Sequence, residues 1–147
     1  MIKKICNNAK IIHDKNLQET CYNWWKYKKI WIMIEKLKIA IIVQAREESV
    51  RFPKKVLYSI SGKPLIINIL DRLKKSKLKN TIIVAIPKNK KNIDLEKILK
   101  KNKHKVFKGH EENVLKRYYD AAKKYKADII IRITADCPFV DSKIIDK

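Results

Sequence analysis

Three short apolar runs constrain the fold of this chain more strongly than any other feature of its sequence. They are rich in isoleucine and occupy residues 39–43, 81–86 and 128–134. Runs of this length and composition are typical of strands that are buried on both faces of a parallel sheet. Helical patterns lie between them. The alternation of strands with helices predicts an α/β fold with three layers, α/β/α, around a mainly parallel sheet.

Apolar residues at helical spacing indicate three helices between and after these strands. The first begins near Pro64, and the second extends from about Asn92 to Lys101. The third follows Glu111 and Glu112, which we expect in its acidic first turn. Its residues at helical spacing are Leu115, Tyr118, Tyr119 and Ala122. Between the second and third helices, residues 106–107 are long enough only for a brief strand.

A polar and basic loop follows the first apolar run. It contains Gln44, Arg46, Ser49, Arg51, Lys54 and Lys55. Because parallel strands end at the same edge of a sheet, this loop and Asp136, which follows the third run, are predicted to share one cleft. Basic side chains bind phosphate groups and a carboxylate binds Mg²⁺, so a nucleoside triphosphate with its metal is the predicted ligand.

The sequence lacks the motifs of two common nucleotide-binding classes. The chain has no G-x-x-x-x-G-K-[ST], which excludes a P-loop kinase or ATPase, and no G-x-G-x-x-G to support a nicotinamide dehydrogenase.

Lys54 and Lys55 could be solvated surface residues, and Asp136 could be a turn or cap residue. Arg46 and Arg51 stand out because arginine is scarce here and both lie in one loop.

The formal net charge of +21 raises the alternative of a basic nucleic-acid-binding module. Only five of the 36 basic residues are arginines, and the lysines are spread through nearly every segment. Proteins that read bases depend on arginine, and single-strand binders add aromatic platforms. Neither pattern is prominent after residue 33. We therefore expect no specific nucleic acid partner.

The cysteines and the hydropathy pattern bear on the cellular compartment. Cys6, Cys21 and Cys137 are odd in number and lack metal-ligand spacing, which is typical of free thiols in a reducing compartment. No apolar run approaches the length of a membrane span, and the N-terminus lacks the apolar core of a signal peptide. We therefore expect a cytoplasmic protein that binds no membrane.

Residues 1–32 do not continue the alternation of strands and helices. We expect a disordered extension or translation upstream of a true start at Met33, with a surface helix that binds a membrane or a partner as the alternative. Residues 33–147 are expected to form a nucleotide-binding domain. Because residues 141–147 resemble the start of a helix, we expect this domain to be the N-terminal part of a larger one.

Four motifs resemble the signatures of one known family. Residues 43–57, VQAREESVRFPKKVL, are similar to Q-A-R-x-x-S-x-R-x-P-x-K-V-L. The other three are SGKPL at 61–65, EENVLKRYY at 111–119 and RITADCP at 132–138. From residue 38 onward the chain therefore resembles the spore-coat polysaccharide biosynthesis F family. That family is related to the acylneuraminate and 3-deoxy-manno-octulosonate cytidylyltransferases.

The resemblance implies a nucleotide-diphospho-sugar transferase fold, which is Rossmann-like. It also implies transfer of CMP from CTP to a sugar acid, with release of pyrophosphate, for surface polysaccharide or glycan biosynthesis. Mg²⁺ would be the cofactor, held by Asp136, and the full-length protein would be a homodimer. Arg46 and Lys55 would be catalytic. The nucleotide would be bound by Gln44, Ala45, Arg46, Ser49, Arg51, Lys55 and, near the base, Gly109.

Two loop positions depart from the family pattern. Glu48 stands where a small residue is usual, and Lys54 stands where glycine is common. A carboxylate in a triphosphate cradle would repel phosphate, and loss of glycine would restrict the backbone at its close approach to phosphate. These departures leave open a second function class, a catalytically impaired fragment that binds CTP or a nucleotide-sugar without turnover.

Overall fold

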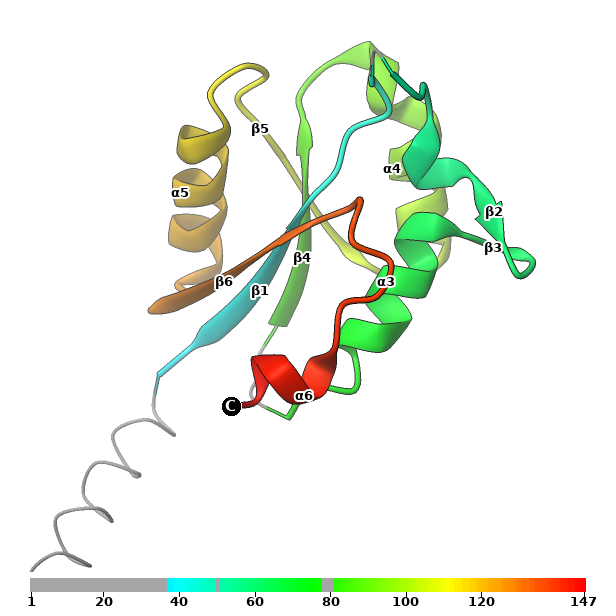
Figure 1. Ribbon diagram of the computed structural model, residues 1–147. Helices are drawn as coiled ribbons and strands as arrows, with labels where there is room; N and C mark the ends of the chain where they lie inside the picture. The colour runs from blue at the N-terminus through cyan, green and yellow to red at the C-terminus, as the bar shows by residue number, and fades with distance from the viewer. Residues whose placement is uncertain (1–36, 50, 78–80) are drawn as a thin grey trace, which may run out of the picture. The chain divides into compact units, whose positions relative to one another are not determined.

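A four-stranded parallel sheet lies at the centre of the structure (Figure 1). Its strand order is β5-β4-β1-β6, so β1 pairs with both β4 and β6. The strands are β1 (Ile39–Gln44), β4 (Thr81–Pro87), β5 (Lys105–Gly109) and β6 (Ile129–Thr134). A separate two-stranded antiparallel pair is formed by β2 (Ser59–Ile60) and β3 (Lys63–Pro64).

The computed structural model describes residues 37–49, 51–77 and 81–147. The predictions for residues 1–32 and for a start at Met33 lie outside the described residues. Residues from Lys38 onward form one compact unit. Within the described residues, no helix has the length and hydrophobicity that a membrane-spanning segment needs.

Helices cover both faces of the sheet because alternate residues of the central strand point to opposite sides. Ile41 and Val43 of β1 pack in the core under α3 (Leu65–Leu73) and α4 (Ile93–Lys101). Ala40 and Ile42 pack in a second core under α5 (Val114–Tyr125). In Figure 1, α3 and α4 lie on one side of the sheet and α5 lies on the other. The predicted three-layer α/β fold is therefore confirmed.

Three short helical segments complete the described elements. They are the 3₁₀ helices η1 (Lys55–Leu57) and η2 (Lys90–Asn92), and the C-terminal helix α6 (Ser142–Ile145). Of these, η1 directly follows the basic loop after β1, and η2 leads into α4. Both therefore lie beside the carboxyl ends of the central strands, where the predicted site is expected.

Two sequence predictions about burial are wrong. The strand at 129–134 is at an edge of the described sheet, so Ile129 and Ile130 are 41% and 40% exposed although the run is almost entirely apolar. On α5, Leu115 and Tyr119 keep the helical spacing but are 81% and 62% exposed. The inner face of α5 is formed by Arg117, Tyr118, Ala121 and Ala122, so of the four predicted residues only Tyr118 and Ala122 are buried.

Two element boundaries also differ from the sequence prediction. Glu111 and Glu112 precede α5 and are not in its first turn, because Asn113 caps the helix by accepting a hydrogen bond from the Lys116 backbone N–H. The strand expected only at 106–107 extends over Lys105–Gly109, because it pairs in parallel with β4 along its whole length.

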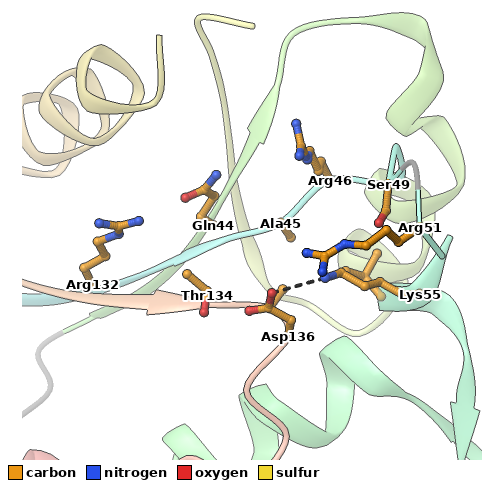
Figure 2. Close-up of a pocket in the computed structure, with 11 residues that line it drawn as sticks. Gln44, Ala45, Arg46, Ser49, Arg51, Lys55, Arg132, Thr134 and Asp136 are labelled. Atoms are coloured by element: carbon orange, nitrogen blue, oxygen red, sulfur yellow. Dashed lines mark hydrogen bonds and ion pairs between the residues drawn. The ribbon is translucent and has the colours of Figure 1, made fainter. Parts of the chain in front are cut away.

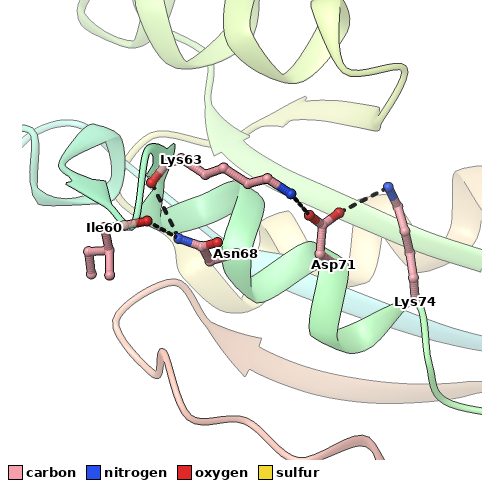
Figure 3. Close-up of polar contacts among 5 residues, drawn as sticks. All are labelled: Ile60, Lys63, Asn68, Asp71 and Lys74. Carbon is pink, nitrogen blue, oxygen red and sulfur yellow. Dashed lines mark hydrogen bonds and ion pairs between the residues drawn. The ribbon is translucent and has the colours of Figure 1, made fainter.

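The β2–β3 hairpin is fixed to α3 by side-chain hydrogen bonds (Figure 3). The Asn68 amide donates to the carbonyls of Ile60 and Lys63 at 2.9 and 3.3 Å. The Asp71 carboxylate pairs with Lys63 at 3.1 Å and with Lys74 at 3.4 Å. These contacts hold the chain in place directly after η1, and so they limit where the basic loop can lie.

The different burial of two isoleucines on neighbouring strands generates a stability prediction. Ile42 of β1 is fully buried, whereas Ile130 of β6 is 40% exposed. Ile42→Ala should lower the free energy of unfolding by about 2–5 kcal/mol, because it leaves a cavity in the core. Ile130→Ala is the matched control and should cost less than about 1.5 kcal/mol. Urea denaturation measures both, and equal losses would contradict the burial pattern.

Candidate functional site

A pocket lies at the carboxyl ends of β1 and β6, where the direction of the strand order reverses. The chain passes from β1 outward through β4 to β5, and then returns to the other side of β1 as β6. In open α/β sheets such a switch point leaves a crevice at the carboxyl ends of the strands, and ligands bind there. The pocket has a volume of about 360 Å³. Its lining residues are Gln44, Ala45, Arg46, Ser49, Arg51, Lys55, Val56, Arg132, Thr134, Ala135 and Asp136 (Figure 2).

The structure brings most of the predicted site residues together in this pocket. Seven of the eight line it, from Gln44 to Lys55 on one side and Asp136 on the other. Figure 2 shows Arg51 directed toward the centre of the pocket, whereas Arg46 points away from Asp136. Gly109 does not line the pocket and lies at the end of β5, an outer strand of the described sheet.

An ion pair between Lys55 and Asp136 joins the two sides of the pocket. Lys55 Nζ lies 3.1 Å from Asp136 Oδ2, although 81 residues separate them in sequence. Hydrogen bonds from the Thr134 hydroxyl and from the Lys55 ammonium lower the pKa of Asp136 below its usual value. The carboxylate is therefore ionised at neutral pH and can act as an anionic ligand for a cation in the pocket.

The pocket carries a strong positive charge. Arg46, Arg51, Lys55 and Arg132 contribute cations, and Asp136 is the only carboxylate among the lining residues. Because the floor is built from strand ends, the backbone there is fixed by sheet pairing: the Ala135 N–H donates to the Gln44 carbonyl at 3.0 Å. A rigid concave site with this charge suits a polyanion such as a triphosphate.

The donor set suits a magnesium ion that binds together with phosphate. The described residues contain no cluster of three or more His, Cys, Asp or Glu side chains that could hold a metal by themselves. Mg²⁺, however, usually binds proteins through one or two carboxylates plus substrate phosphates and keeps several waters. Asp136, half-exposed in a cationic pocket, fits that mode.

Comparison with known proteins decides the family. A family model described as cytidylyltransferase matches residues 40–147, which include the whole sheet except the first residue of β1. The chain belongs to the cytidylyltransferase family. The resemblance inferred from the four sequence motifs is therefore confirmed.

Individual members of the cytidylyltransferase family match the same region. The spore coat polysaccharide biosynthesis protein SpsF of Bacillus subtilis is 34% identical over 112 residues, which is 74% of this chain and 47% of SpsF. A cytidylyltransferase structure from Leptospira borgpetersenii is 40% identical with a TM-score of 0.71, over 75% of this chain and 46% of that one. CMP:2-keto-3-deoxy-manno-octonic acid synthetase, solved in complex with CTP, is 25% identical with a TM-score of 0.67, over 74% and 44%.

The chain spans about half the length of the cytidylyltransferases that it matches. The matching half contains the β1 loop and the end of β6, and thus every residue that lines the pocket. The pocket can therefore be compared with the family pattern within this half alone.

Glu48, which departs from the family pattern, does not line the pocket. Its carboxylate accepts a hydrogen bond from Lys91 at 2.7 Å and lies 3.5 Å from the Asn89 amide. The bond from Lys91 lowers the pKa of Glu48, so the group stays ionised and paired outside the lining. Glu48 therefore does not lie inside the cradle as its place in the loop implied, because Lys91 and Asn89, which follow β4, bind its side chain.

The backbone conformation at Lys54 explains why glycine is common at this position. Its backbone has a φ of 55° and a ψ of 21°, in the left-handed region that glycine adopts without a steric cost. Its side chain also leaves the pocket and pairs with Asp94 at 2.9 Å. The loop thus reaches the conformation that glycine would favour, at a cost of about 1–2 kcal/mol.

Sequence reasoning did not assign a role to Arg132 or Thr134, which also line the pocket. The register pairs Ile42 with Arg132 and Gln44 with Thr134, so both side chains lie on the same face of β6. The Arg132 guanidinium lies 5.7 Å from the centre of the Tyr118 ring, which holds it over α5. The strand period of two, counted back from Asp136, was the signal that could have identified them.

Gly109 was predicted only as a residue near the base of the nucleotide, but it also has a packing role. A Cβ atom added at this position would lie 2.7 Å from Arg117 Cγ and 2.7 Å from Phe107 Cε1. Arg117 is buried and cannot move easily, because it donates to the His110 carbonyl at 2.8 Å and to the Glu111 carbonyl at 2.6 Å. Gly109 therefore makes room for the arginine that shapes the β5–α5 connection.

This packing yields a prediction for Gly109→Ala. The added methyl group should lower the free energy of unfolding by roughly 1–3 kcal/mol, because Arg117 or Phe107 must shift. Urea denaturation measures the loss, and CTP titration at a temperature where the variant is folded measures binding. If stability were unchanged and only CTP affinity fell, Gly109 would be a nucleotide contact and not a packing residue.

Proposed function

We propose that this chain binds the triphosphate of CTP and serves an enzyme that transfers CMP to a sugar acid with release of pyrophosphate. The observation that supports it best is the pocket at the switch point, which is lined by three arginines and by the ion pair of Lys55 with Asp136. Membership of the cytidylyltransferase family supports CTP as the nucleotide. The related synthetase that was solved with CTP supports a sugar acid as the acceptor.

In this proposal the basic side chains bind and orient the triphosphate. Arg51 and Lys55 would neutralise the β- and γ-phosphates, while Arg46 and the Ser49 hydroxyl would bind from the same loop. Gln44 and Ala45, at the end of β1, would lie against the nucleotide. Arg46 and Lys55 would also stabilise the charge that develops on the pyrophosphate leaving group, which is the catalytic role proposed for them.

Asp136 would hold Mg²⁺ together with oxygens of the triphosphate. The metal, when bound, would withdraw charge from the phosphate oxygens and so favour departure of pyrophosphate. Lys55 would then share Asp136 with the metal or leave it, because its ammonium contacts Oδ2 of that carboxylate. The same ammonium can move to a phosphate oxygen, so neither charge would be left without a partner.

The reaction itself requires few covalent steps from the protein. A hydroxyl oxygen of the sugar acid would form a bond to the α-phosphorus of CTP, the bond from that phosphorus to the bridging oxygen of pyrophosphate would break, and the hydroxyl proton would pass to water. Positioning of the hydroxyl in line with the leaving group and charge stabilisation account for most catalysis in phosphoryl-type transfer. The product would be a CMP-activated sugar for a polysaccharide or glycan.

Pyrophosphate release from CTP tests this function. With CTP, Mg²⁺ and a panel of sugar acids, the protein should release pyrophosphate with at least one acceptor. Asp136→Asn should lower that rate by about 100-fold or more, since even groups behind a metal ligand typically contribute 10–100-fold. Asp120→Asn is the matched control, because Asp120 lies on α5 and does not line the pocket.

Three results would each contradict a part of this proposal. CTP binding without pyrophosphate release from any acceptor would favour the alternative of a nucleotide-binding chain without turnover. Equal rates for Asp136→Asn and the unchanged protein would show that Asp136 is not the metal ligand. Salt-sensitive binding of DNA or RNA that survives alanine substitution of Arg46, Arg51 and Lys55 together would favour a nucleic-acid-binding module.

A further inference from the structure

Glu47 is a buried carboxylate beside the pocket that the proposed chemistry does not use. Only 3% of its surface is exposed, although it lies in the basic loop between Arg46 and Ser49. One carboxylate oxygen, Oε1, accepts a hydrogen bond from the Leu95 backbone N–H at 2.8 Å. Leu95 is the third residue of α4, so Glu47 accepts from one of the N–H groups at the start of that helix that have no partner within the helix.

The backbone of the loop is attached to the same helix end. The Glu47 N–H donates to Oδ1 of Asn92, the residue that precedes α4, at 2.9 Å. Asn92 is itself buried and donates to Oδ1 of Asn89. These contacts join the loop after β1 to the connection after β4, and both lie at the carboxyl edge of the sheet.

The far end of the loop returns to Glu47 and to α4. The Lys54 N–H donates to the Glu47 carbonyl at 2.8 Å, which closes the segment that carries Ser49 and Arg51. The Lys54 ammonium pairs with Asp94 of α4 at 2.9 Å and lies 3.8 Å from Glu47 Oε2. Both ends of this segment are therefore fixed to the first turn of α4, and Lys55 follows immediately.

The helix end that holds Glu47 would otherwise attract a phosphate group. The N-terminus of a helix combines free N–H groups with the positive end of the helix dipole, and it binds anions readily. Here the chain's own carboxylate already occupies that position. The triphosphate must then be bound by the side chains of the loop, and the accuracy of their placement depends on the attachment of the loop to α4.

We propose that Glu47 is a positioning residue for triphosphate binding, which acts by anchoring the loop of Ser49, Arg51 and Lys55 to the N-terminus of α4. This inference rests on the proposed function for the identity of the ligand. It predicts that the stability of the loop and that of the first turn of α4 are coupled, so that a ligand bound by the loop also stabilises the start of the helix.

The sign of the effect on CTP affinity distinguishes positioning from plain electrostatics. Removal of a carboxylate beside an anion site should strengthen anion binding if only charge matters. If Glu47 positions the loop, Glu47→Ala should instead bind CTP about tenfold more weakly than Glu47→Gln. The glutamine variant removes the charge but keeps an oxygen that accepts from Leu95, so it should bind as tightly as the unchanged protein or more tightly.

Isothermal titration with CTP in metal-free buffer measures these affinities. Glu96→Ala is the matched control, because Glu96 also lies on α4 but pairs with Lys100 and Lys108, and no hydrogen bond or ion pair joins it to the described residues of the loop. Its affinity should be unchanged. Alanine and glutamine variants of Glu47 that are both folded and bind CTP equally would overturn the positioning role and leave the proposed function intact. An unchanged protein that does not bind CTP would overturn both.

If Glu47→Ala does not fold, hydrogen exchange on the unchanged protein tests whether Glu47 couples the loop to α4. The Leu95 and Lys54 amides both donate to Glu47, so addition of CTP should slow their exchange together. The Lys116 amide, which donates to the Asn113 cap of α5, should not change and serves as the internal control. Protection of loop amides without any change at Leu95 would overturn the coupling.

Discussion

The pairing of β1 with β6 is the interaction on which the functional part of the structure depends. The register places Gln44 opposite Thr134, so that the basic loop and the segment of Asp136 leave the sheet at the same level. The Ala135 N–H extends this pairing by one bond to the Gln44 carbonyl, and the Ala45 N–H bonds to the Ala85 carbonyl. These backbone bonds bring residues more than 80 positions apart within reach of one ligand.

Arginine and lysine have different roles in this basic chain. Three of its five arginines, Arg46, Arg51 and Arg132, line the pocket. The other two bind backbone carbonyls: Arg72 bonds to Val140, and Arg117 bonds to His110 and Glu111. Seven lysines of the described residues form ion pairs, such as the exposed pair Lys91–Glu48, and exposed pairs stabilise a fold little. The net charge of +21 therefore says less about function than the position of the few arginines does.

Sequence patterns predicted the layers of the fold and the convergence of the basic loop with Asp136, because both follow from strand composition and the rules of parallel sheets. They could not predict which apolar strand lies at an edge, since Ile129 and Ile130 look as apolar as the residues of β1. They also misplaced Glu48 and overlooked Glu47. The direction of a loop side chain depends on partners 43 and 48 residues away, here Lys91 and Leu95, and no local pattern contains that information.

Amide NMR of the isotope-labelled protein during a CTP titration tests most directly whether the switch-point pocket is the nucleotide site. The largest shift changes should occur at residues 44–49, 51–55 and 134–136, with smaller ones at the start of α4. They should persist at 150 mM salt, roughly the physiological level at which exposed charge contacts are screened. Changes spread over the lysines at the ends of α4 and α5, and lost at that salt concentration, would contradict a nucleotide site in this pocket.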